Sequence, residues 1–124
     1  MGKKNLVFFQ QRFYPAGTYN WTVPAGCTSI DVFLVGAGGG AKDTMPGGGG
    51  YTKTFKKDTT GWRDGDAIPV TPGETIQIIV GRGSSGDGGY SQFKSSSYRA
   101  NGGKAGSGSG SSSKGGDGGS GAAV

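Results

Sequence analysis

Two stretches of this sequence follow the same plan, and that repetition limits the possible folds more than any single motif does. Residues 23–55 and 70–93 each contain a Pro/Gly turn, an apolar strand ending in Val-Gly-x-Gly, a glycine-rich segment and a short aromatic strand. Such internal repeats indicate an architecture built from copies of one supersecondary unit. The repeated unit is strand, glycine segment, strand, and it holds no catalytic set. It therefore favours a scaffold that presents loops over an enzyme.

Apolar residues and turn signals predict strands throughout the chain and almost no helix. The expected strands are 5–14, 18–23, 29–35, 51–57, 67–70, 75–80 and 90–94. Of these, 29–35 and 75–80 are apolar enough for central positions in a sheet. We therefore expect an all-β fold, a small β-sandwich built from the two strand–glycine–strand repeats. Its β-rich domain spans 1–100, and 101–124 follow as a Gly/Ser-rich tail or polyglycine-II segment.

Glycine makes up 29 of the 124 residues and recurs at a spacing of three in several segments. A period of three is that of the polyproline-II helix, and such helices can bundle when glycine faces each neighbour. We expect bundled polyglycine-II helices over 36–50 and 81–89. For 101–124, both a bundled segment and a flexible linker remain open. If Gly38 and Gly83 lie in packed backbone contacts, their replacement by valine should cause misfolding.

The composition excludes most catalytic chemistry. The chain has no histidine and one cysteine, Cys27, which excludes an internal disulfide, an ordinary zinc site and a histidine-activated nucleophile. Residues 36–41 match a dinucleotide-binding pattern, but the Pro- and Gly-rich residues that follow cannot form the required helix. Asp64 and Asp66 are interpreted as a solvated turn. We expect no enzyme, no catalytic or metal residues and no cofactor.

The charge of +5, with a pI near 9.5, is spread along the chain in runs no longer than two. This pattern is typical of a solvated surface, so no specific nucleic-acid partner is expected. The interleaved aromatics are interpreted as sheet core. The apolar run 6–9 is too short for a signal peptide, and no segment is long enough to span a membrane. Membrane insertion is therefore not expected.

Loops on a rigid scaffold are the remaining candidates for function. Exposed Trp, Tyr and Arg side chains on held loops often form recognition sites. The loops of this chain suggest the contact residues Lys42, Met45, Trp62, Arg63, Tyr98 and Arg99. Trp62 stands among polar residues and glycine, so a core position and an exposed position both remain open.

Two patterns carry a resemblance to a known family. They are Gly17-x-x-x-Trp21-Thr-Val-Pro24-Ala-Gly26 leading to Val-Gly36-Ala-Gly38, and Pro-Gly73-Glu-Thr-Ile leading to Val-Gly81-Arg-Gly83. Over about 13–106 the chain resembles the glycine-rich domain of bacteriophage tail-fibre and adhesin proteins. The resemblance assigns scaffold roles to Trp21, Pro24, Gly26, Gly36, Gly38, Gly73, Gly81 and Gly83. It implies a β-rich domain leading into packed polyglycine-II helices, with loops between these helices contacting the bacterial surface.

This resemblance implies a non-catalytic virion component, a fibre or tail-tip adhesin that presents loops to a bacterial surface receptor. The expected partners are other virion proteins and a surface protein or glycan, and a homotrimer is one possible state. The protein would be made in the host cytoplasm, released by lysis and located in the virion. Two alternatives remain open: a purely structural head fibre or capsid decoration, and a bacterial surface protein that binds carbohydrate.

Overall fold

A computed structural model describes residues 10–41 and 45–106, and strands are the only regular elements among them. The strands are β1 (Gly17–Thr22), β2 (Ser29–Ile30), β3 (Val32–Val35), β4 (Thr52–Phe55), β5 (Ile68–Pro69), β6 (Thr75–Val80), β7 (Ser91–Phe93) and β8 (Arg99–Ala100). The chain therefore has the all-β fold expected from its sequence. Residues 5–9 of the first expected strand lie outside the described residues, and 10–14 form no strand.

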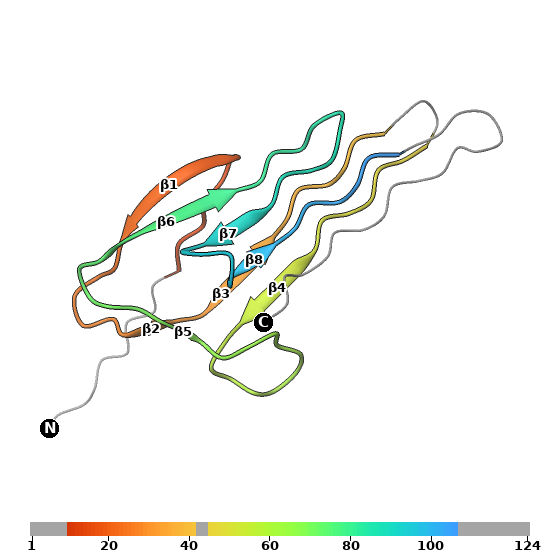
Figure 1. Ribbon diagram of the computed structural model, residues 1–124. Coiled ribbons are helices and arrows are strands. Elements are labelled where there is room, and N and C mark those ends of the chain that lie inside the picture. Colours follow the sequence, from red (N-terminus) through yellow and green to blue (C-terminus); the bar gives the residue numbers. More distant parts are fainter. Residues whose placement is uncertain (1–9, 42–44, 107–124) are drawn as a thin grey trace, which may run out of the picture.

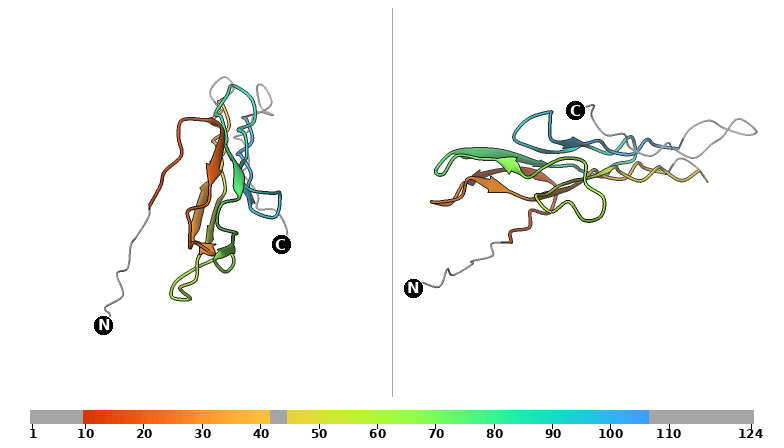
Figure 2. Two further views of the ribbon diagram at one scale, coloured as in Figure 1. Left: turned by 90° about the vertical axis from the view of Figure 1, so that its left-hand side faces the viewer. Right: turned by 90° about the horizontal axis from the view of Figure 1, so that it is seen from below.

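The strands form two layers (Figure 2). The larger layer is an antiparallel sheet in the order β1-β6-β7-β8, where β1 and β6 pair along their whole length, from Gly17 opposite Val80 to Thr22 opposite Thr75. The second layer consists of the β2–β5 and β3–β4 pairs. The central position expected for 75–80 is confirmed, because β6 lies between β1 and β7.

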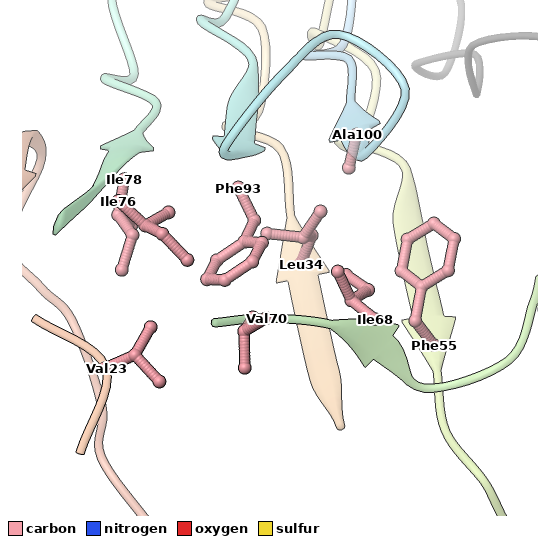
Figure 3. Packing of buried hydrophobic residues seen from close by; sticks show 9 residues of the cluster. All are labelled: Val23, Leu34, Phe55, Ile68, Val70, Ile76, Ile78, Phe93 and Ala100. Carbon is pink, nitrogen blue, oxygen red and sulfur yellow. The ribbon is translucent and has the colours of Figure 1, made fainter. Parts of the chain in front are cut away.

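The core lies between the two layers (Figure 3). Both layers contribute to it, with the buried residues Val23, Leu34, Phe55, Ile68, Val70, Ile76, Ile78, Phe93 and Ala100. Half-buried aromatics extend this core at its margins: the Trp21 ring packs 6.3 Å from that of Phe93. Alternation along the strands explains this packing, because successive side chains point to opposite faces of a sheet.

The expected strand 29–35 differs from its prediction in two ways. It is divided at Asp31, whose carboxylate accepts a hydrogen bond from the backbone N–H of Lys57 (3.1 Å). Among the described residues β3 pairs with β4 alone, so it is not a central strand. Its outer face stays open, and Phe33 is 65% exposed and Val35 51%. The apolar pattern on both faces was thus a misleading signal of two-sided burial.

The two Pro/Gly turns of the repeat have matching geometry. Cys27 N–H donates to the carbonyl of Pro24, and Gly26 in this turn has φ 80°. In the second turn Glu74 N–H donates to the carbonyl of Thr71, and Gly73 has φ 86°. Positive φ at the third turn position favours glycine, which explains why both turns have glycine there.

Beyond the strand ends, glycine-rich segments lie side by side and extend the molecule in one direction (Figure 1). We call them the glycine bundle, which comprises residues 36–41, 45–51, 81–90 and 101–106. Hydrogen bonds between these segments recur at every third residue. The N–H groups of Gly36 and Gly39 donate to the carbonyls of Tyr51 and Gly48, and those of Gly103 and Gly106 donate to Ala37 and Gly40.

A three-residue step is the period of the polyproline-II conformation, and here it is present in the bonding between segments. The step runs antiparallel between 36–41 and 45–51 and parallel between 36–41 and 101–106. The polyglycine-II arrangement expected for the inner segments is therefore supported by their hydrogen bonds. Residues 101–106 belong to the same bundle, so the glycine-rich packing continues across the expected boundary at residue 100.

Some glycines of the bundle face the backbone of a neighbouring segment so closely that no side chain would fit, and we call these positions the inner rows. A Cβ atom on Gly50 would overlap the carbonyl of Gly36, and one on Gly102 would overlap that of Gly88. Gly38 and Gly83 differ, because the nearest atoms to such a Cβ would lie 3.7 Å and 3.9 Å away, at ordinary contact distance. The condition for misfolding of the valine variants, tight backbone contact at these two glycines, is therefore not met at their Cβ positions. The three-residue glycine spacing in the sequence thus predicts the bundle, but it does not predict which glycine of each turn faces a neighbouring segment.

Asp87 joins two segments of the bundle. One carboxylate oxygen accepts a hydrogen bond from the backbone N–H of Ala105 (2.8 Å), and the other lies 3.4 Å from the Nζ atom of Lys104. The Ala105 bond, with a further contribution from Lys104, lowers the pKa of the Asp87 carboxyl below its ordinary value of 3.8. The charged form of Asp87 is thus the one that holds segment 101–106.

Gly50→Ala is expected to destabilise the protein by about 1–3 kcal/mol, because its methyl group would have to displace the backbone at Gly36. That loss corresponds to a melting temperature lower by about 4–8 °C for each kcal/mol. Gly49→Ala is the matched control, since no atom lies within 4 Å of a Cβ there. Thermal unfolding followed by circular dichroism measures both. Equal melting temperatures of the two variants would contradict tight packing at Gly50.

Asp87→Asn is expected to lower the melting temperature at pH 7, by an amount that shrinks in acid. Because the pKa of Asp87 is lowered on folding, its contribution to stability is complete above 3.8 and is lost as the pH falls through the folded-state value. The wild type and the variant should therefore melt at converging temperatures toward about pH 2. A difference that stays constant between pH 7 and pH 2 would show that the carboxylate charge contributes nothing.

Candidate functional site

A loop interrupts the edge of the second layer. β4 ends at Phe55 opposite Val32, and β5 begins at Ile68 opposite Ile30. The residues that pair with the ends of β4 and β5, Val32 and Ile30, are thus close neighbours in the sequence. The two strands themselves are separated by residues 56–67. These residues leave the sheet edge and return to it, projecting away from the glycine bundle (Figure 1). We call this excursion the 56–67 loop.

Backbone and carboxylate bonds fasten the base of the 56–67 loop to β4. The Asp64 carboxylate accepts a hydrogen bond from Thr54 N–H (2.7 Å), and Asp64 N–H donates to the Thr54 carbonyl (2.7 Å). Lys56 N–H donates to the carbonyl of Gly65 (3.1 Å). Gly65 also lies against the Phe55 ring, where a Cβ atom would come within 3.1 Å of the ring. The loop is therefore joined to the core rather than attached only at its ends.

Polar side chains inside the loop bond back to it. The Arg63 guanidinium donates to the Lys56 carbonyl (3.2 Å) and pairs with Asp66. The Lys56 ammonium donates to the Thr60 carbonyl (2.7 Å). The hydroxyl and the backbone N–H of Thr60 both donate to Asp58, and these bonds lower the pKa of the Asp58 carboxyl. Each bond removes freedom from the loop before any partner arrives.

Trp62 projects from this fastened loop into solvent and is 77% exposed. The exposed alternative for Trp62 is therefore the one that the structure shows. A large aromatic side chain on a preorganised loop is the kind of group that dominates binding energy at protein interfaces. The 56–67 loop with Trp62 is the best candidate for a recognition site among the described residues.

The other expected contact residues are dispersed. Arg63 shares the loop with Trp62 but bonds inward, and Met45 is half-buried in the glycine bundle with its carbonyl against Gly106. Lys42 lies outside the described residues. The structure thus brings two of these candidates, Trp62 and Arg63, into one loop and leaves Met45 at another place.

Tyr98 and Arg99 are also used within the fold. Tyr98 packs edge-on against Phe55, with ring centroids 5.3 Å apart, as part of the border of the core. The Arg99 Nε atom donates to the side-chain carbonyl of Gln92 (2.8 Å), and its guanidinium lies 3.9 Å from the Tyr90 ring centroid. Their contact with a receptor stays a prediction. Tyr98 packs against the core, as expected for the interleaved aromatics, whereas the structural role of Arg99 was not indicated by the sequence.

The acidic residues of the 56–67 loop do not form a metal-binding cluster. No group of three or more His, Cys, Asp or Glu side chains within the described ranges could hold a metal ion. Asp64 and Asp66 do not form an acidic pair: Asp64 bonds to Thr54 and Asp66 pairs with Arg63. The interpretation of Asp64 as part of a solvated turn is wrong, because it is half-buried and fastens the loop.

In the part of the chain that the structure describes, no helix could cross a membrane.

Asp64→Ala is expected to loosen the 56–67 loop, because Thr54 N–H loses the carboxylate that ties it to the loop. The stability loss should be about 1–2 kcal/mol, with faster amide hydrogen exchange at Thr54 and Lys56. Asp66→Ala is the matched control, since it removes the same charge from an exposed ion pair and should cost under about 0.5 kcal/mol. Equal exchange rates in the two variants would contradict the fastening role of Asp64.

Comparison with known proteins agrees with the architecture. The model of a family described as the glycine-rich domain matches residues 14–124, which is most of the chain. Searches of curated proteins and of solved structures give no significant match. The matched range contains both repeats, the glycine bundle and the 56–67 loop. The chain belongs to the glycine-rich domain family.

Proposed function

We propose that the protein is a non-catalytic virion component of a bacteriophage, a fibre or tail-tip adhesin that presents loops to a receptor on the bacterial surface. The observation that carries this proposal is the 56–67 loop, which is fastened at its base and exposes Trp62. Rigid scaffolds with functional loops are common among recognition proteins. Its partners are other virion proteins and a surface protein or glycan.

The arrangement of the molecule supports the same proposal. The glycine bundle extends in one direction, and the 56–67 loop projects away from it (Figure 1). Because backbone hydrogen bonds join neighbouring segments of the bundle, it can serve as a stiff spacer between an attachment point and a binding surface. The net charge of +5 favours approach to an anionic cell surface.

Binding to intact cells of candidate host bacteria tests this function. Labelled protein should bind saturably and reduce adsorption of the competing phage. Trp62→Ala should weaken cell binding by about thirtyfold or more, since truncating an aromatic side chain that dominates an interface costs about 2 kcal/mol or more. Its melting temperature should change little, because the Trp62 side chain is 77% exposed.

Tyr14→Ala is the control for this experiment. Tyr14 is an aromatic residue of similar exposure, 74%, and lies outside the 56–67 loop. Equal binding by the wild type and both variants would remove Trp62 from the contact surface. A folded protein that binds no host cell and does not compete with phage would contradict the adhesin function, and binding to empty capsids would then indicate a purely structural virion role.

A further inference from the structure

From a second surface, separate from the 56–67 loop, we infer that the protein binds acidic sugars, such as the uronic acids of a bacterial surface polysaccharide. The surface is a groove where the end of the β1–β6 pair meets the glycine bundle. This inference rests on the proposed adhesin function and names the ligand class that the groove accommodates. Its chemistry can be tested without cells.

The groove has a volume of about 320 Å³ and is lined by Gly17, Thr18, Ile79, Val80, Gly81, Arg82, Gly89 and Tyr90. Three of these residues are glycines, so backbone forms much of its surface. Among the lining residues, Tyr90, Arg82 and Thr18 have polar side chains. A shallow groove with an aromatic ring, a cation and a hydroxyl suits a ligand that is flat, hydroxylated and acidic.

The Tyr90 ring is held in place before a ligand binds. The Arg99 guanidinium lies 3.9 Å from the ring centroid, and Arg99 itself is fixed through its Nε–H bond to Gln92. Gln92 belongs to β7 and is buried. Tyr90 as a whole residue keeps 37% of its surface exposed, so it remains accessible to a ligand. A preoriented ring loses less entropy on binding than a mobile one.

The charge at the groove is positive. Arg82 is exposed, and among the described residues it forms no ion pair. The carboxylates of the described ranges are bonded at other places, those of Asp31, Asp58, Asp64, Asp66, Glu74 and Asp87. None of them lines the groove. An anionic ligand would therefore meet the Arg82 guanidinium without competition from a neighbouring acid.

A hexuronate matches these groups one by one. The apolar face of its pyranose ring can lie on Tyr90, while its carboxylate accepts paired hydrogen bonds from the Arg82 guanidinium. The hydroxyl of Thr18 and the groove's backbone can bond the sugar hydroxyls. Single-stranded nucleic acid fits less well, because its recognition relies on successive aromatic platforms and this groove is lined by one aromatic residue.

Polygalacturonate and its methyl-esterified form are the probes, since esterification removes the charge and leaves the sugar backbone unchanged. The full chain should bind polygalacturonate in isothermal titration calorimetry and bind the ester at least about tenfold more weakly. Arg82→Gln and Tyr90→Leu should each weaken binding to polygalacturonate by about tenfold. Arg12→Gln is the matched control, because it removes one exposed charge outside both the groove and the 56–67 loop and should change affinity by less than about twofold.

Three results would overturn the inference: equal binding of polygalacturonate and its ester, equal losses in Arg82→Gln and Arg12→Gln, or tighter binding of an oligodeoxythymidylate than of polygalacturonate. The last would indicate a nucleic-acid groove. If cells are bound through Trp62 but polygalacturonate is not bound, the groove inference falls and the adhesin function stands. If polygalacturonate is bound in the groove but no cell is bound, the adhesin function falls.

Discussion

The close approach of glycine backbones in the bundle is the constraint on which the rest of the structure depends. β3, β6 and β8 each run into the bundle at their C-terminal ends, and β4 and β7 emerge from it. The bundle therefore connects both layers: Ala37 N–H donates to the Gly89 carbonyl, and Gly103 N–H donates to Ala37. A side chain at one of the inner-row glycines would push these backbones apart, and the two layers of strands would be separated with them. The Ser91 hydroxyl adds a further tie by donating to the Val35 carbonyl (2.6 Å).

The sequence predicted the elements that depend on local chemistry. Both Pro/Gly turns, β6 and the three-residue glycine period follow from residues next to one another. It failed where distant partners decide the outcome. The apolar outer face of β3 suggested a central strand, but among the described residues this strand pairs with β4 alone, and Phe33 on its outer face is exposed. The tight glycines could not be told from the open ones, because that depends on which neighbour each residue faces. Gly38 and Gly50 look alike in sequence.

The candidate site, like the fold, was predictable from the sequence only where neighbouring residues decide the outcome. The polar surroundings of Trp62 left its exposure open, and no sequence pattern indicated that Asp64 bonds to both the N–H and the carbonyl of Thr54. Tyr98 was expected on a loop surface, yet it packs on Phe55 because the short β8 pairing draws its segment against the core. The groove at Tyr90 and Arg82 is formed by three separate parts of the chain, and its residues carry no recognisable spacing.

The three-residue bonding step has a consequence for how proteins of this kind can change in length. Polyproline-II helices rise about 3.1 Å per residue, so one full turn measures about 9 Å. Inserting one residue into 36–41 would rotate every later residue by a third of a turn and direct side chains at the backbone of 101–106. Inserting three residues would add one full turn, so the glycines would again face the neighbouring segments. Length variation within the segments should therefore come in whole turns, whereas the loops that connect them can gain or lose single residues.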